Sequence, residues 1–148
     1  FNIAEDPSGN IWFARRDGFI KYDGEKFTNY NFIKGFGNGN SIRKVVADRY
    51  GHIWYASDSG LIKFDGKDIY NFGIAEGLKS ASVGYIVEDT INKKIWFSTD
   101  FGLSAINTEL QDEKTGKEVL EQLTRTEYFG YTNQIKRLLV LIIGNLKK

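Results

Sequence analysis

The chain has 148 residues, about the size of one domain, with 20 Lys and Arg against 19 Asp and Glu and a net charge of +1. Because no basic run or stripe stands out, the charge distribution gives no indication of nucleic-acid binding. The chain contains no cysteine, which excludes disulfides and thiolate metal sites.

A tryptophan recurs every 42 residues, at Trp12, Trp54 and Trp96. Each stands in a short apolar run of the form Ile-Trp-aromatic-small, and a glycine follows it six residues later. A period of roughly 40–45 residues, rich in aromatic and turn residues, is typical of β-propeller blades. The sequence therefore predicts an all-β fold, a partial β-propeller of about three to three and a half four-stranded blades with a 42-residue repeat.

The first copy, residues 1–40, begins inside a repeat, since Phe1-Asn2-Ile3 stands where a first strand should already be running. We therefore expect the chain to be a fragment or a trimmed product, short of the roughly 4–8 blades of a closed ring. Asp6-Pro7-Ser8-Gly9 predicts the first turn. Asp23-Gly24 predicts a two-residue hairpin, because Gly tolerates the positive φ of a type I′ turn. A glycine-rich linker, residues 34–41, leads to the next copy.

The second copy, residues 41–82, predicts four strands, at 45–47, 53–56, 61–64 and 68–72. Its second strand is a continuous apolar run rather than an alternating one, which indicates that both of its faces are covered. Stacked blades create that condition, because each sheet lies between two others. None of the copies shows the 3.6-residue apolar period over ten or more residues that helical repeats require.

The third copy, residues 83–130, departs from this pattern. Its first turn, residues 89–94, is one residue longer than the others and has lost the Gly. A polar insertion at 107–118 replaces the last turn, and the outer strand is expected near 119–123.

The last residues, 131–148, are either the start of a fourth blade or a frayed tail. Residues 135–143 fit the inner strand of a fourth blade, whereas 134–148 also fit a basic amphipathic helix, and both alternatives stay open. The apolar run at 138–143 is far shorter than the roughly 20 residues of a membrane-spanning helix. A blade that is cut off would expose a strand edge, and such edges invite pairing.

Positions at which the copies agree are expected to serve packing between blades and turn geometry. These predicted core positions are Trp12, Phe13, Gly18, Trp54, Tyr55, Gly60, Trp96, Phe97 and Gly102. Positions at which the copies differ, although the residues on either side agree, are free to provide specificity. Loops on a rigid scaffold are where binding usually resides. The second turn of each copy has this character, and in a propeller it lies at the channel mouth with the linkers.

These turns give a hypothetical ligand-binding or partner-binding surface. Its candidate residues are Arg15, Arg16, Asp17, Asp58, Ser59, Asp100 and Phe101. Arg binds carboxylate or phosphate in a bidentate manner, and Asp together with an aromatic side chain suits a sugar. The alternative is that these are simply solvated turns.

Carboxylates near the first turn, Glu5-Asp6, Asp48 and Glu88-Asp89, could suggest acid–base chemistry or metal binding. Turn capping by Asp explains them without any chemistry. The only histidine, His52, also occupies a first turn, away from the channel mouth. We therefore predict no catalytic residues, no metal, no cofactor and no enzyme activity in this stretch.

The repeat resembles the two-component regulator propeller repeat, whose pattern is I-x-E-D-x-x-G-N-I-W-F-G-T followed by G-L-x-R-Y-D-G. The matching segments are Ile3–Ala14, Gly18–Gly24, Gly60–Gly66 and Ile86–Asp89, and the linkers around Gly35-Phe36 and Gly77–Ser80 fit as well. The resemblance covers about residues 1–106 and, more loosely, extends to 143. The repeats differ from WD40 blades because no Trp-Asp pair occurs.

The resemblance implies a sensory role: such repeats commonly form the extracytoplasmic part of hybrid two-component sensors, and the histidine kinase lies elsewhere in the parent protein. It implies a periplasmic or extracytoplasmic location on a membrane-anchored parent and a role in phosphorelay signal transduction. The expected partners are the remaining blades of the same propeller, a saccharide or other small ligand, and a second copy in a homodimer, with no nucleic acid.

Three alternatives remain open. One is a stand-alone secreted or periplasmic binding propeller, and another is a propeller lyase or hydrolase whose catalytic groups lie in other blades. In the third, two chains close one seven-bladed ring.

Overall fold

The computed structural model describes residues 2–15, 18–31, 42–111 and 118–122, and within them the regular structure consists of strands joined by turns. The first sheet contains β1 (Asn2–Glu5), β2 (Ile11–Arg15), β3 (Gly18–Tyr22) and β4 (Phe27–Asn31). The second contains β5 (Ile42–Ala47), β6 (Ile53–Ser57), β7 (Gly60–Phe64) and β8 (Ile69–Phe72). The third contains β9 (Val83–Asp89), β10 (Lys94–Thr99), β11 (Gly102–Gln111) and β12 (Glu118–Gln122).

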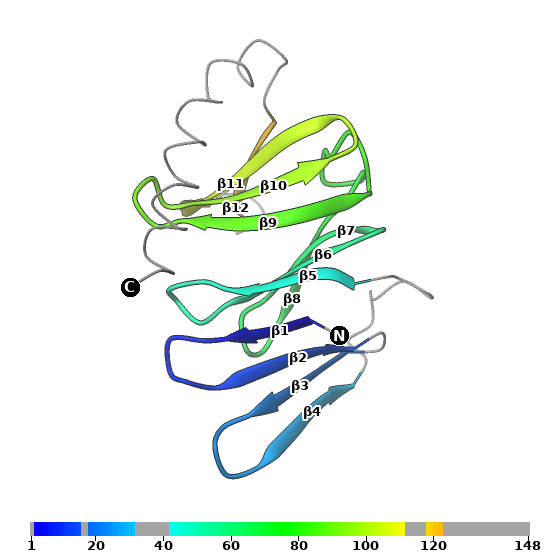
Figure 1. Ribbon diagram of the computed structural model, residues 1–148. Helices are drawn as coiled ribbons and strands as arrows, with labels where there is room; N and C mark the ends of the chain where they lie inside the picture. Colours follow the sequence, from blue (N-terminus) through cyan, green and yellow to red (C-terminus); the bar gives the residue numbers. More distant parts are fainter. Residues whose placement is uncertain (1, 16–17, 32–41, 112–117, 123–148) are drawn as a thin grey trace, which may run out of the picture.

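Each sheet is an antiparallel meander in which neighbouring strands follow one another along the chain. The three sheets are stacked face to face, and β1, β5 and β9, the first strand of each sheet, lie side by side along one edge of the stack (Figure 1). This arrangement is that of propeller blades around a channel. The prediction of an all-β partial β-propeller is confirmed, and the sheets are called the first, second and third blade below.

The turns explain why glycine recurs in the repeat. Gly24 and Gly66, in the β3–β4 and β7–β8 hairpins, have φ values of 96° and 100°. Gly60 starts β7 with a φ of 134°, and a Cβ there would come within 2.4 Å of the carbonyl oxygen of Phe72. Any larger residue at Gly60 would therefore push β8 away from β7.

The third blade differs in detail from the expected pattern. β11 continues to Gln111, past Asn107, where the polar insertion was predicted to begin. The backbone N–H of Thr108 donates to the carbonyl of Lys93 at 2.9 Å, and the register with β12 shifts between Asn107 and Gln111. The chain thus stays paired for several residues longer than expected. Residues 112–117 and the tail 131–148, with its strand and helix alternatives, lie outside the described residues.

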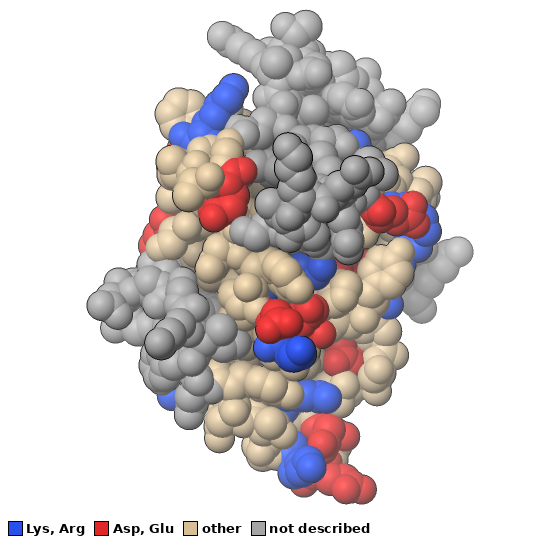
Figure 2. Space-filling view, turned by 180° about the vertical axis from the view of Figure 1, so that it is seen from behind, with Lys and Arg blue, Asp and Glu red and all other residues tan. Residues whose placement is uncertain are grey.

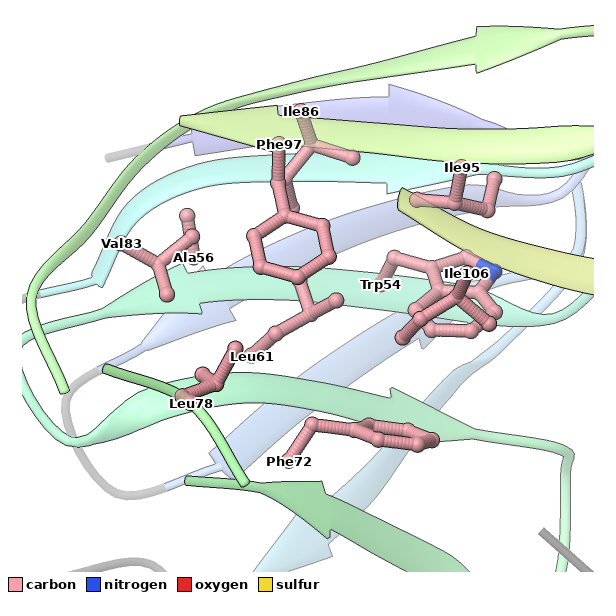
Figure 3. Close-up of a cluster of buried hydrophobic side chains, with 10 residues drawn as sticks. All are labelled: Trp54, Ala56, Leu61, Phe72, Leu78, Val83, Ile86, Ile95, Phe97 and Ile106. Carbon is pink, nitrogen blue, oxygen red and sulfur yellow. The ribbon is translucent and has the colours of Figure 1, made fainter. Parts of the chain in front are cut away.

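Apolar side chains fill the spaces between the blades. One cluster joins the first blade to the second and consists of Trp12, Ala14, Phe19, Val45, Ile53, Tyr55, Ile62 and Phe64. The other joins the second blade to the third and consists of Trp54, Ala56, Leu61, Phe72, Leu78, Val83, Ile86, Ile95, Phe97 and Ile106 (Figure 3). Each blade therefore has two faces, which we name the Trp face, with Trp12 or Trp54, and the receiving face, with Tyr55 or Phe97.

The second blade is covered on both faces, and all five residues of β6 are buried. This confirms the interpretation of the continuous apolar run at 53–56. Within the described residues, no helix is long and apolar enough to cross a membrane.

Candidate functional site

A buried carboxylate holds the tryptophan of each blade. Asp6, Asp48 and Asp89 are among the few buried charged side chains of the described residues. Their Oδ2 atoms accept a hydrogen bond from the indole Nε1 of the Trp in the same blade, at 2.8, 2.8 and 3.2 Å. We name this pair the Asp–Trp clamp.

The same carboxylates also organise the first turn. Oδ1 of Asp48 accepts the backbone N–H groups of Tyr50 and His52, both at 2.9 Å, and Oδ2 lies 3.1 Å from Nδ1 of His52. In the first and third blades an asparagine, Asn10 or Asn92, donates its side-chain amide instead. The turn-capping interpretation of these aspartates is supported, because their oxygens are occupied by donors within the blade.

The clamp should make the fold sensitive to acid. Burial raises the pKa of Asp6, Asp48 and Asp89, but the hydrogen bonds they accept outweigh it, so each pKa lies below its ordinary value. A carboxyl with a lowered pKa in the folded state contributes stability above its unfolded pKa of about 4, and this is lost as the pH falls through the folded value. We expect Tm, followed by circular dichroism, to fall below about pH 4. Equal Tm values at pH 3 and pH 6 would contradict this.

An ammonium group lies over the ring of each indole. The Nζ atoms of Lys21, Lys63 and Lys94 lie 5.7, 5.6 and 5.6 Å from the ring centroids of the Trp in their blades. In the first two blades this Lys is paired with the Trp across the strands, whereas in the third Ala105 stands at that register position and Lys94 supplies the cation from β10. These lysines therefore belong to the blade scaffold.

The opposite end of the blades carries the second turns and the linker at 73–82, and we call it the second-turn end. Here Arg43, on β5, connects two blades. Its Nη2 atom lies 2.5 Å from Oδ1 of Asp58, in the β6–β7 turn, and its Nη1 atom donates to Oγ of Ser82, before β9, at 3.2 Å. The Arg43 and Asp58 side chains are 45% and 42% exposed, so both remain open to a ligand.

A second polar contact lies in the same region. Oγ of Ser80 donates to Oδ2 of Asp100, in the β10–β11 turn, at 3.4 Å, and it accepts the backbone N–H of Ser82 at 3.1 Å. The linker serines thus connect the Arg43–Asp58 pair with Asp100. Two aromatic side chains of the third blade, Tyr85 and Phe101, are 75% and 72% exposed.

The second turns are built to hold variable side chains. In the second blade Oγ of Ser57 donates to the carbonyl of Gly60 at 2.9 Å and accepts the N–H of Ser59 at 3.2 Å. Thr99 makes the equivalent contacts in the third blade, with Gly102 and Phe101. The turn backbone is therefore fixed by a hydroxyl side chain, which is buried in Ser57 and partly buried in Thr99.

The structure brings some of the sequence candidates together. Asp58 and Asp100 belong to the linked polar contacts, and Ser59 and Phe101 are exposed beside them. Arg15 ends β2 in the first blade and is partly buried, whereas Arg16 and Asp17 lie outside the described residues.

Sequence reasoning missed Arg43, which lies on β5 before the apolar residues at 45–47 and has no repeat signal of its own. It also missed the Asp–Trp clamp, although an Asp six or seven residues before each Trp could have revealed it.

The charges do not form a field of one sign on the face shown in Figure 2, where Lys and Arg alternate with Asp and Glu. Among the described residues, no group of three or more His, Asp or Glu side chains is placed to hold a metal ion.

No family model matches the chain, and no curated protein matches it. Solved structures share its fold. The extracellular domain of the putative hybrid two component system BT3049 from B. thetaiotaomicron matches 84% of this chain at 22% identity, with a TM-score of 0.58. The corresponding domain of BT4673 from B. thetaiotaomicron matches 82% at 16% identity, with a TM-score of 0.57. YCF48 bound to D1 peptide matches 81% at 14% identity, with a TM-score of 0.51.

The chain spans only a small part of these structures, namely 18%, 16% and 38% of their lengths. At these identities the likeness shows the fold. The three blades share their fold with parts of the extracellular domains of two hybrid two-component systems.

Proposed function

We propose that this chain is part of an extracytoplasmic sensory β-propeller of a hybrid two-component signalling protein, in which the propeller binds a ligand or partner and a histidine kinase elsewhere in the parent reads the result. The observation that carries the proposal is the shared fold with two extracellular domains of such systems. The resemblance of the repeat pattern supports the same role, and it implies an extracytoplasmic location on a membrane-anchored parent.

The second-turn end is the proposed binding surface. Its backbone is fixed by Ser57 and Thr99, whereas the side chains that follow them vary from blade to blade. Arg43 offers a guanidinium to an anionic or hydroxyl-rich ligand, and Asp58 offers a carboxylate. A ligand that engages Arg43 would alter its hydrogen bond to Ser82, just before β9, so binding at this residue is coupled to the geometry between the second and third blades.

The binding proposal has a direct test. The purified chain is screened by thermal shift against a panel of oligosaccharides and small carboxylates, and any compound that raises Tm is measured by calorimetry. We expect Arg43→Ala and Asp58→Ala each to weaken binding at least about tenfold, because charge-assisted hydrogen bonds contribute about 1.5–3 kcal/mol. Asp68→Ala, an exposed carboxylate in the β7–β8 turn at the other end of the blade, is the matched control.

Unchanged binding in the Arg43 and Asp58 variants would place the ligand elsewhere. If a ligand binds all of these variants equally well, the proposed sensory role is retained, but the second-turn end is rejected as its binding surface.

A stand-alone binding propeller is the second candidate, and one comparison favours it. YCF48 shares the fold and is seen bound to a peptide. The coding DNA on both sides of this stretch separates the two candidates. More 42-residue copies followed by a membrane helix and a kinase core would support the sensor, whereas a signal peptide, a closed set of blades and a stop would support the binder.

A further inference from the structure

The receiving face of the first blade is an apolar surface that differs from its counterparts. In the second and third blades the equivalent face is buried against the Trp face of the blade before it in the chain. In the first blade Ile11, Phe13 and Ile20 are only partly buried, and Ile3 is 60% exposed. Their register equivalents in the second blade, including Tyr55 and Ile62, are buried between two sheets.

A charged contact accompanies one of the two complete interfaces. Arg49 follows the turn aspartate of the second blade, and Glu88 precedes the turn aspartate of the third. Oε1 of Glu88 accepts the backbone N–H of Arg49 at 3.0 Å and lies 3.5 Å from its Nε. The Arg49 guanidinium also donates to the carbonyl of Thr90. We name this contact the interblade latch.

The latch is absent from the other interface, which has Pro7 and Ala47 at the two equivalent positions. It is therefore an optional feature that distinguishes one neighbour from another. Glu5 precedes the turn aspartate of the first blade, as Glu88 does in the third, and it is exposed on β1. The first blade thus presents the acidic half of a latch beside its apolar receiving face.

We propose that the receiving face of the first blade docks a further propeller blade of the same polypeptide, one with a Trp face and with Arg or Lys directly after its turn aspartate. Both complete interfaces are formed by a blade and the one that precedes it in the chain, which argues for the same polypeptide as the source. The basic residue follows from charge complementarity with Glu5. This inference rests on the blade architecture and is independent of the proposed sensory function.

The first test adds a blade to the full chain. A copy of residues 42–84, which carries Arg49 and keeps the 42-residue spacing of the tryptophans, is placed before Phe1. We expect Tm to rise by at least about 5 °C, because an open apolar face becomes an interface. Ile20→Lys should remove this gain in the extended chain and change Tm of the original chain by less than about 2 °C. An unchanged Tm on extension, or an equal effect of Ile20→Lys in both chains, would overturn the proposal.

The second test exploits the lack of cysteine in the chain. In the extended chain, Glu5→Cys is combined with Arg49→Cys in the added copy and the protein is oxidised. The positive control is Arg49→Cys with Glu88→Cys in the original chain, and the negative control replaces Glu5→Cys by Glu25→Cys, an exposed turn position of the same blade. We expect a disulfide yield close to the positive control. A yield like that of Glu25→Cys in a folded sample would overturn the predicted latch.

A second copy of the chain is the competing occupant. The mass of the original chain in solution distinguishes it from a blade of the same polypeptide. A monomer at micromolar concentration supports the proposal, whereas a dimer that Ile20→Lys dissociates would assign the face to self-association and overturn the same-chain source.

Discussion

Trp54→Ala should destabilise the fold more than any other single truncation in the second blade, by about 3–5 kcal/mol. The indole is 0% exposed, stacks near Phe72 with 6.1 Å between ring centroids, and packs against the receiving face of the third blade. Its removal leaves a cavity between two sheets, and it also leaves Asp48 without the Nε1 donor. The free energy of unfolding from urea titration, followed by circular dichroism, measures the effect.

The matched control is Phe101→Ala, another aromatic truncation but at an exposed turn position. It should change the free energy of unfolding by less than about 1 kcal/mol, since surface substitutions usually have small effects. Similar losses for Trp54→Ala and Phe101→Ala would show that the space between the second and third blades is not the main source of stability.

Asp48→Ala should be the second most damaging change, at about 2–4 kcal/mol, because unpaired buried donors cost about 1–3 kcal/mol each. The substitution leaves the indole of Trp54 and the backbone N–H groups of Tyr50 and His52 without their acceptor. It also removes a negative charge that acts on Lys63, whose pKa is lowered by burial and partly restored by the Asp48 charge.

Two further variants separate the parts of this effect. Asp48→Asn keeps an acceptor oxygen and should recover a large part of the loss at neutral pH, while it removes the carboxyl that titrates below about pH 4. Asp68→Ala, an exposed aspartate in the same blade, is the control and should be nearly neutral. If Asp48→Ala is as mild as Asp68→Ala, the Asp–Trp clamp contributes little to stability.

Much of the fold could be predicted from the sequence because every blade of a propeller has the same structural requirements. Every blade has to bury a large aromatic between two sheets and to reverse direction in short turns, so Trp12 and Gly18 recur as Trp54 and Gly60. The continuous apolar run at 53–56 correctly indicated a strand covered on both faces. The length of β11 was less predictable, because residues 107–111 are mostly polar and remain paired through backbone hydrogen bonds that composition does not reveal.

The site was harder to predict than the fold. Variation among the second turns made Asp58 and Asp100 candidates, because a position that differs between the copies, while its neighbours stay the same, is not needed for packing. Their partners lie far away in sequence: the pairing of β5 with β6 brings Arg43 close to Asp58, and the linker before β9 brings Ser80 close to Asp100. The Asp–Trp clamp was missed for a different reason, since a turn aspartate already has a sufficient local explanation.

The meander of each sheet has a consequence for how the chain folds. Every strand pairs with its neighbour in sequence, and each Asp–Trp clamp closes within six or seven residues. Such local contacts have a small loop-closure entropy, which favours rapid formation of individual hairpins. Blades that contact only their neighbours can form in any order, so nucleation in the second blade, which is covered on both sides, would propagate outward in both directions.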